Sequence, residues 1–105
     1  MKQRWANGES GIGLWLSLPA PSVAANIGSL DPDYLVVDMQ HGLIDYADVP
    51  QLFRASQRST ATPLIRVPWN EPGIIGKVLD AGALGVIIPM VNTAEQAERA
   101  VSSCF

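Results

Sequence analysis

Cysteine, histidine and basic residues are scarce in this sequence: its 105 residues include one cysteine, one histidine and seven Lys and Arg. The lone cysteine, Cys104, cannot form an internal disulfide, so we expect a cytoplasmic protein in a reducing compartment. Ten Asp and Glu residues bring the net charge to −3, and no basic patch suits a nucleic-acid backbone. No apolar run has the length of a membrane span or the pattern of a signal peptide. We therefore expect neither a nucleic acid nor a membrane as partner.

Glycine fingerprints of the dinucleotide-binding and P-loop types are also missing, which argues against an open nucleotide-binding fold. The sequence instead contains four short apolar runs, at residues 11–18, 34–39, 63–67 and 85–91. The runs are continuous rather than alternating, as expected for strands covered on both faces in a parallel sheet. Their length and β-branched content favour strands.

Each apolar run is followed by a stretch with helix signals. The third such helix is expected to end at Ala81 and Gly82, where glycine can take the left-handed conformation. Two helices have an apolar stripe that we expect to be buried, Val23, Ile27 and Leu30 in the first and Ala94, Ala97, Val101 and Cys104 in the fourth. The predicted helix starts are Ser22, Asp48 before Pro50, Asn70 before Glu71 and Pro72, and a Thr93–Gln96 capping box.

This β-α-β-α-β-α-β-α order predicts an α/β fold with parallel strands joined by right-handed crossovers. The pattern alone fits either an open doubly wound sheet or part of a closed barrel. A closed (β/α)₈ barrel usually needs 200 or more residues, so 105 residues supply only about half of one. We expect residues 1–105 to form a single partial domain.

Chemically useful side chains lie near the ends of the first three strands. Trp15 lies within the first run, Asp38 and His41 lie at the end of the second, and Arg66 lies in the third. In parallel α/β folds these ends gather binding and catalytic groups at one edge. His41 precedes Gly42, which lets the backbone turn without covering the imidazole. The histidine can act as a general base or acid, or simply make a hydrogen bond in a loop.

The charged and aromatic candidates each leave two interpretations open. Arg66 has apolar neighbours and needs an anionic partner, which is either a substrate carboxylate or enolate, or Asp38 in an internal ion pair. Asp38 itself can orient a neighbour or cap a loop. Trp15 and Trp69 can pack at the rim or contact substrate. Asp80 opposes the dipole at a helix end, which indicates either a partner elsewhere or an exposed side chain.

Four segments occur in an order and spacing that resemble the HpcH/HpaI aldolase family. They are GLWLSLPAPSVA, YLVVDMQHG, PLIRVPWNEP and KVLDAGALGVIIPMVNTAEQAERAV, and they cover nearly the whole chain beyond its first ten residues. The resemblance implies a (β/α)₈ barrel, usually hexameric or otherwise homo-oligomeric, that cleaves 2-keto-hydroxy acids to pyruvate and an aldehyde. It also implies a divalent metal ion, Mg²⁺, Mn²⁺ or Co²⁺.

The resemblance assigns roles to three residues of this chain. His41 is the implied catalytic base, Asp80 raises its basicity, and Arg66 binds the pyruvate oxygens and stabilises the enolate. Trp15, beside them, is expected to contact substrate. One departure is Gln40, at a position where many members have glutamate.

The second departure concerns the metal, because the family's two acidic metal ligands lie on later strands than this chain contains. The sequence therefore supports two expectations of different kinds. One is a metal-dependent carbon–carbon lyase that is incomplete in this chain and truncated before its second half. The other is a non-catalytic half barrel that self-associates through its open edges.

Overall fold

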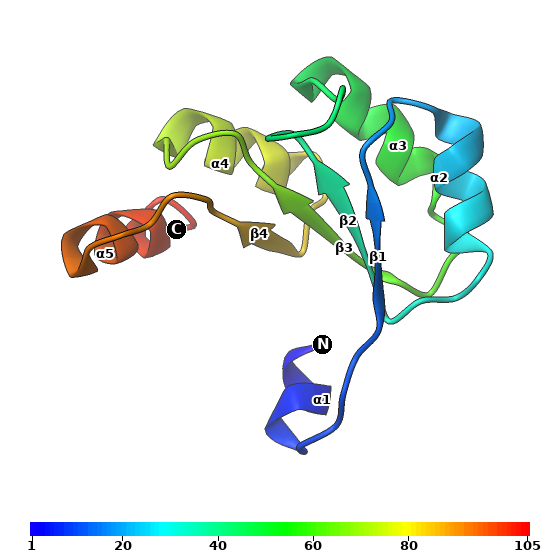
Figure 1. The fold of residues 1–105 in the computed structure, drawn as a ribbon, viewed down its shortest axis with the longest axis horizontal. Helices are drawn as coiled ribbons and strands as arrows, with labels where there is room; N and C mark the ends of the chain where they lie inside the picture. The colour runs from blue at the N-terminus through cyan, green and yellow to red at the C-terminus, as the bar shows by residue number, and fades with distance from the viewer.

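A parallel four-stranded sheet organises the chain in the computed structural model, which describes all 105 residues (Figure 1). The strands are hydrogen-bonded in chain order, and all three pairs are parallel. A helix follows each strand, which confirms the predicted α/β order of four consecutive βα units. The strands are β1 (Gly13–Leu16), β2 (Tyr34–Asp38), β3 (Thr62–Arg66) and β4 (Gly85–Ile87).

Three of the helices cover one face of this sheet (Figure 1). None of the helices has the length and apolar character needed to cross a lipid bilayer. A short N-terminal helix that the sequence patterns did not predict lies near the amino ends of the strands, where Arg4 pairs with Asp33. The helices are α1 (Lys2–Ala6), α2 (Pro21–Gly28), α3 (Val49–Ala55), α4 (Pro72–Asp80) and α5 (Ala94–Ser102), with a 3₁₀ turn η1 (Tyr46–Asp48) before α3.

The hydrophobic core lies between the sheet and helices α2, α3 and α4. Alternate strand residues supply one side of it, because successive side chains of a strand point to opposite faces. The helices supply the other side from their buried positions. This layer contains Leu16, Leu35, Val37, Ile65 and Val67 from the strands and their extensions, and Ala24, Leu52, Phe53, Ile75 and Val78 from the helices.

The opposite face of the sheet presents the candidate site residues. In the observed register Trp15 is beside Val36, and Asp38 is beside Arg66. Laterally paired residues share a face, and Val36 and Asp38 share one by the period of two. Trp15, Asp38 and Arg66 therefore all project from the face that does not pack on the core helices.

Three predicted helix starts are confirmed to within one residue and one is wrong. Thr93 and Gln96 form the expected capping box, and the N-cap of α4 is Glu71, one residue after Asn70. Asp48 is the N-cap residue of α3, as predicted, but its carboxylate accepts the backbone N–H of Asp45 at 2.9 Å instead of capping α3. Ser22 is not a cap, because α2 starts at Pro21, whose fixed φ suits the first helical position.

The end of α4 is confirmed, with Ala81 at the C-cap and Gly82 at φ +111°. The expected burial of two helix stripes is wrong in part. Leu30 lies beyond the end of α2 and is exposed, whereas Val23 and Ile27 pack against the core. Ala94, Ala97 and Val101 of α5 are exposed and Cys104 is half-buried, because α5 extends away from the core helices (Figure 1).

Candidate functional site

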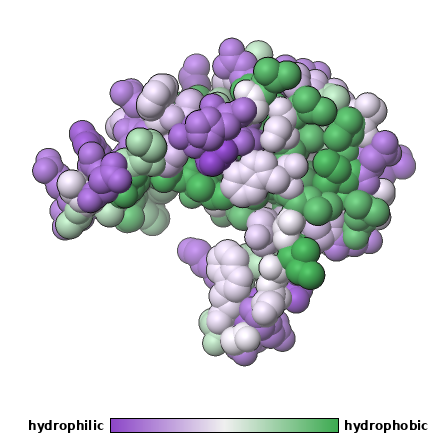
Figure 2. Space-filling view, in the orientation of Figure 1, coloured by the Kyte–Doolittle hydropathy of each residue, from purple (hydrophilic) through white to green (hydrophobic).

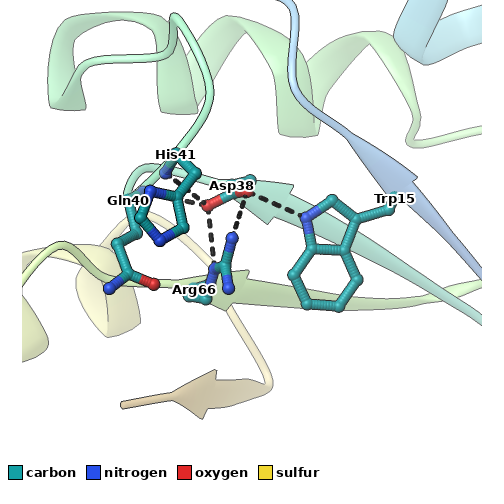
Figure 3. A network of polar contacts seen from close by, with 5 residues as sticks. All are labelled: Trp15, Asp38, Gln40, His41 and Arg66. Carbon is teal, nitrogen blue, oxygen red and sulfur yellow. Dashed lines mark hydrogen bonds and ion pairs between the residues drawn. The ribbon is translucent and has the colours of Figure 1, made fainter. Parts of the chain in front are cut away.

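The carboxylate of Asp38, the last residue of β2, is the centre of a polar network (Figure 3). Its Oδ1 accepts hydrogen bonds from Arg66 Nε at 3.0 Å and from the backbone N–H groups of Gln40 at 2.9 Å and His41 at 3.3 Å. Its Oδ2 accepts from Arg66 Nη2 at 2.6 Å and from Trp15 Nε1 at 3.0 Å. Asp38 therefore both orients neighbouring side chains and caps the loop that follows β2, which are the two alternatives that the sequence left open.

These contacts keep Asp38 ionised although the residue is only 2% exposed. Burial by itself raises the pKa of the carboxyl group, but hydrogen bonds from Arg66, then Trp15, then the backbone of Gln40 and His41 outweigh it. The net result is a pKa well below the usual value for an aspartate. The hydrogen bond to Asp38 likewise raises the pKa of Arg66. The site therefore contains a permanent carboxylate–guanidinium pair.

The ion pair with Asp38 does not use the whole guanidinium of Arg66. Asp38 contacts the side of the group formed by Nε and Nη2, whereas Nη1 makes no hydrogen bond. Nη1 is not fully buried, because the only fully buried side-chain polar atom without a hydrogen-bond partner is Oδ1 of Asn70. The Nη1–Nη2 edge therefore presents two parallel N–H groups that match a planar carboxylate or a 2-keto acid. The internal ion pair with Asp38 is confirmed, whereas binding of an anionic substrate at the remaining edge of Arg66 stays a prediction.

Trp15 and His41 lie on either side of Arg66 in the close view (Figure 3). The Trp15 ring centroid is 5.0 Å from Cζ of Arg66, which is a cation–π distance. The His41 imidazole is exposed and makes no hydrogen bond, so its ring nitrogens are free for a ligand. An imidazole, a guanidinium edge and an aromatic ring thus share one end of the sheet.

Gly42 allows the loop after His41 to pass close to β1. A Cβ atom at this position would lie 2.7 Å from the backbone oxygen of Ser17 and 2.8 Å from that of Asp38, which is closer than side chains tolerate. The next residue, Leu43, donates its backbone N–H to Ser17 O at 2.9 Å. The glycine signal in the sequence therefore reflects close backbone packing that fixes where His41 leaves the sheet.

Asp80 does not join this group of residues. It is the last residue of α4, which runs back from the carboxyl end of β3 toward the amino end of β4. Its side chain is exposed and makes no hydrogen bond or ion pair. The structure thus brings together Trp15, His41 and Arg66 of the predicted site residues. It adds Asp38 as the centre of the site, a residue that the sequence indicated as a possible ion-pair partner of Arg66.

The residues of this chain do not form a metal site. No group of three or more His, Cys, Asp or Glu side chains comes together. The one carboxylate in the network, Asp38, already has both oxygens occupied by hydrogen-bond donors. We therefore assign no metal ligand among these residues.

The largest hollow in the molecule, of about 600 Å³, lies elsewhere. It is lined by α1, by Thr62 and Leu64 of β3, and by the whole of β4 with Leu84 before it. Sites in parallel α/β barrels lie at the carboxyl ends of the strands, where the network of Asp38 and Arg66 is found. We place the candidate site at the network for this reason.

The parallel α/β fold presents an imidazole and a guanidinium edge at the carboxyl ends of its strands, where barrel-type enzymes carry their sites. Comparison with known proteins shows which protein family the chain belongs to. The family model of HpcH/HpaI aldolase/citrate lyase matches residues 11–105. The chain belongs to the HpcH/HpaI aldolase/citrate lyase family, so the predicted resemblance is confirmed.

Individual relatives agree with this assignment. Hydroxypyruvate/pyruvate aldolase of Rhizorhabdus wittichii is 40% identical over 99 residues, which are 94% of this chain and 39% of that protein. 5-keto-4-deoxy-D-glucarate aldolase of Salmonella paratyphi A is 42% identical over 93 residues, 88% of this chain and 36% of that protein. These names support an aldolase-type lyase in general terms. The chain spans well under half the length of either relative.

A solved structure shows the same arrangement of elements. A family protein from Burkholderia cenocepacia J2315 superposes with a TM-score of 0.90 at 36% identity, over 97% of this chain and 41% of that one. The four βα units described above thus correspond to the predicted half of a (β/α)₈ barrel.

Proposed function

We propose that residues 1–105 are a single partial barrel domain that provides the pyruvate-binding half of a cytoplasmic carbon–carbon lyase. The substrate is a 2-keto acid with a 4-hydroxyl group, and the products are pyruvate and an aldehyde. The observation that carries the proposal is the free Nη1–Nη2 edge of Arg66 beside an unengaged His41 imidazole. Relatives named as pyruvate and keto-glucarate aldolases support the same class of substrate.

In this reaction His41 acts as the base and Arg66 stabilises negative charge. An imidazole nitrogen of His41 takes the proton of the 4-hydroxyl group, the C3–C4 bond breaks, and the aldehyde forms. The electron pair of that bond passes to the keto acid and gives the pyruvate enolate. Two N–H groups of Arg66 donate to the substrate carboxylate and the developing enolate oxygen, which lowers the barrier electrostatically. Protonation of C3 then yields pyruvate.

A divalent metal ion is part of the proposed reaction, but this chain's residues are not proposed to bind it. The family resemblance implies Mg²⁺, Mn²⁺ or Co²⁺, and such an ion supplies Lewis-acid stabilisation of an enolate when it is bound. The resemblance places the acidic metal ligands on later strands of the barrel, so the steps above depend only on His41 and Arg66. Without Lewis-acid stabilisation of the enolate, we expect the isolated chain to release pyruvate slowly.

Release of pyruvate from 4-hydroxy-2-oxopentanoate, measured with a coupled lactate dehydrogenase assay, tests this function. With added Mg²⁺, Mn²⁺ or Co²⁺ we expect release above the protein-free rate. The variant Arg66→Lys should lower that rate at least about tenfold, because an ammonium group cannot present two parallel N–H donors. Arg54→Lys, an exposed arginine on α3, is the matched control. If the wild-type chain releases no pyruvate with any of the three ions, the aldolase proposal for this chain is wrong.

Exposed apolar residues at both edges of the sheet favour a second candidate function, self-association. On the β1 side Ile12 is 75% exposed and Leu30 is 72% exposed, and on the β4 side Leu84 is 74% exposed. Figure 2 shows hydrophobic residues gathered over the β1 and α2 side of the molecule. β1 and β4 each pair with one neighbour only, so each has unpaired backbone groups. We propose a homo-oligomer in which these edges meet.

Sedimentation velocity at several protein concentrations measures this association directly. We expect a dimer or larger species for the wild type, and a shift toward monomer when Leu30→Lys introduces a charge at the β1 edge. Trp69→Lys is the control, because Trp69 is 66% exposed but lies in the loop after β3, a strand that is paired on both sides. A folded monomer at all concentrations would exclude self-association.

A further inference from the structure

Trp15 contacts both members of the ion pair at the candidate site. Its indole Nε1–H donates to Oδ2 of Asp38 at 3.0 Å, and its ring faces the Arg66 guanidinium at 5.0 Å (Figure 3). The residue belongs to the edge strand β1, while Asp38 and Arg66 belong to β2 and β3. One side chain therefore ties three neighbouring strands together at the site.

Core packing does not account for these contacts. Trp15 is 46% exposed and projects from the face of the sheet opposite α2, α3 and α4. It is also absent from the hydrophobic core and from the partly buried residues that pack against that core. Two of the other large exposed side chains, Trp5 and Trp69, donate no hydrogen bond through their indole groups. Trp15 differs from them in having a specific polar partner.

The geometry limits the motion of Arg66 in two independent ways. The carboxylate of Asp38 fixes the Nε and Nη2 side of the guanidinium, and the Trp15 ring lies against the group itself. The indole N–H in turn occupies Oδ2 of Asp38, so this oxygen has less freedom to rotate away from Nη2. Pre-organised donors bind an anion more tightly because less ordering is required on binding.

We infer that Trp15 is a positioning residue that holds the Nη1–Nη2 edge of Arg66 toward an incoming keto acid. This inference rests on the proposed function, since it specifies how the anion-binding edge of that same site is oriented. It assigns the indole N–H and the indole ring separate contributions. The N–H acts through Asp38, and the ring acts on Arg66 directly.

Oxalate, a planar dianion that resembles the pyruvate enolate, is the probe, and its affinity is measured by isothermal titration calorimetry. Trp15→Phe keeps an aromatic ring and loses the N–H donor, whereas Trp15→Leu loses both. We expect oxalate affinity to fall about threefold in Trp15→Phe and about tenfold in Trp15→Leu, in line with a hydrogen bond and a cation–π contact of moderate strength. Trp5→Phe, at an exposed position on α1 without an indole hydrogen bond, should bind like the wild type.

A second measurement reports on Arg66 itself and does not depend on ligand binding. The Nε–H signal of Arg66 in ¹⁵N NMR spectra, assigned by its absence in Arg66→Lys, should be protected from solvent exchange in the wild type. It should exchange faster in Trp15→Leu while the melting temperature shows that the chain is folded. A role in folding alone would change the melting temperature without this selective loss of protection.

The possible outcomes separate the two proposals. If Trp15→Leu binds oxalate within twofold of the wild type and leaves the Arg66 signal protected, the positioning role is wrong and the proposed function stands. If the wild type does not bind oxalate although Trp15 controls Arg66 exchange, the proposed function fails and the contact between the two side chains stands as structural. Reduced affinity together with faster exchange supports the positioning role.

Discussion

Replacing His41 with alanine is expected to lower pyruvate release by about 10²–10⁴-fold while leaving the fold intact. The size of the loss follows from removing the group that takes the hydroxyl proton. Stability should change little, because the imidazole is exposed and makes no hydrogen bond. The backbone N–H that donates to Asp38 at 3.3 Å is retained in the variant. The coupled pyruvate assay and thermal unfolding by circular dichroism measure the two effects.

Asp80→Asn is the informative companion variant for this experiment. The family resemblance makes Asp80 a residue that raises the basicity of His41, whereas the structure places it at the end of α4 without a polar partner. If each copy of the chain acts alone, we expect Asp80→Asn to change the rate of pyruvate release by less than about twofold, as for other exposed surface substitutions. A tenfold fall in the rate of pyruvate release in Asp80→Asn would show that Asp80 of one copy of the chain reaches His41 of another.

For the His41→Ala variant, a rate of pyruvate release above one third of the wild-type rate would exclude His41 as the base.

The sequence was sufficient to predict the order of strands and helices, because this order depends on local patterns. Continuous apolar runs and capping residues are local features, and both can be recognised without knowing which elements pack against them in the fold. The lengths of the edge strands were less predictable. The first run extends over residues 11–18, yet β1 covers only Gly13–Leu16, since a strand with one partner extends only as far as the two strands pair. β4 is shortened at its carboxyl end for the same reason, ending at Ile87.

The candidate site was predictable as a set of residues but not as a geometry. The place of His41 and Arg66 after parallel strands was enough to bring them to one edge. Whether Arg66 pairs with Asp38 or with substrate depends on which guanidinium nitrogens face which group, and that is a matter of side-chain conformation. The structure shows the internal pair on one side of the group and a free edge on the other. The burial of α5 was mispredicted because a helix stripe is buried only if another element covers it.

Removing the Asp38 carboxylate is expected to be the most destabilising change at the site. Asp38→Ala leaves a half-buried guanidinium and two backbone N–H groups without their acceptor. Breaking one partner of a buried ion pair typically lowers the free energy of unfolding by about 3–5 kcal/mol. Asp38→Asn keeps the shape and one acceptor oxygen, so it should fall between the wild type and Asp38→Ala. Urea unfolding followed by circular dichroism gives these free energies.

A control and a rescue make the result specific to the ion pair. Asp80→Asn removes a carboxylate from an exposed position at the end of a helix, so stability should be unchanged or slightly increased. In Asp38→Leu/Arg66→Met both charges are replaced by apolar groups of similar size. The double variant should regain much of the stability lost in Asp38→Ala, because no charge is left without a partner. Equal losses in Asp38→Asn and Asp80→Asn would show that the pair contributes nothing.

The same pair predicts a particular dependence of stability on pH. The pKa of Asp38 is lower in the folded chain than the value of about 3.9 for an aspartate in an unfolded chain. The unfolded state therefore binds the proton more tightly, and the contribution of Asp38 is complete above about pH 4 and lost as the pH falls below it. The difference in unfolding free energy between the wild type and Asp38→Asn should shrink by about 1 kcal/mol between pH 7 and pH 3. A difference that stays constant over that range would mean that the carboxylate is not held in its charged form by Arg66 and Trp15.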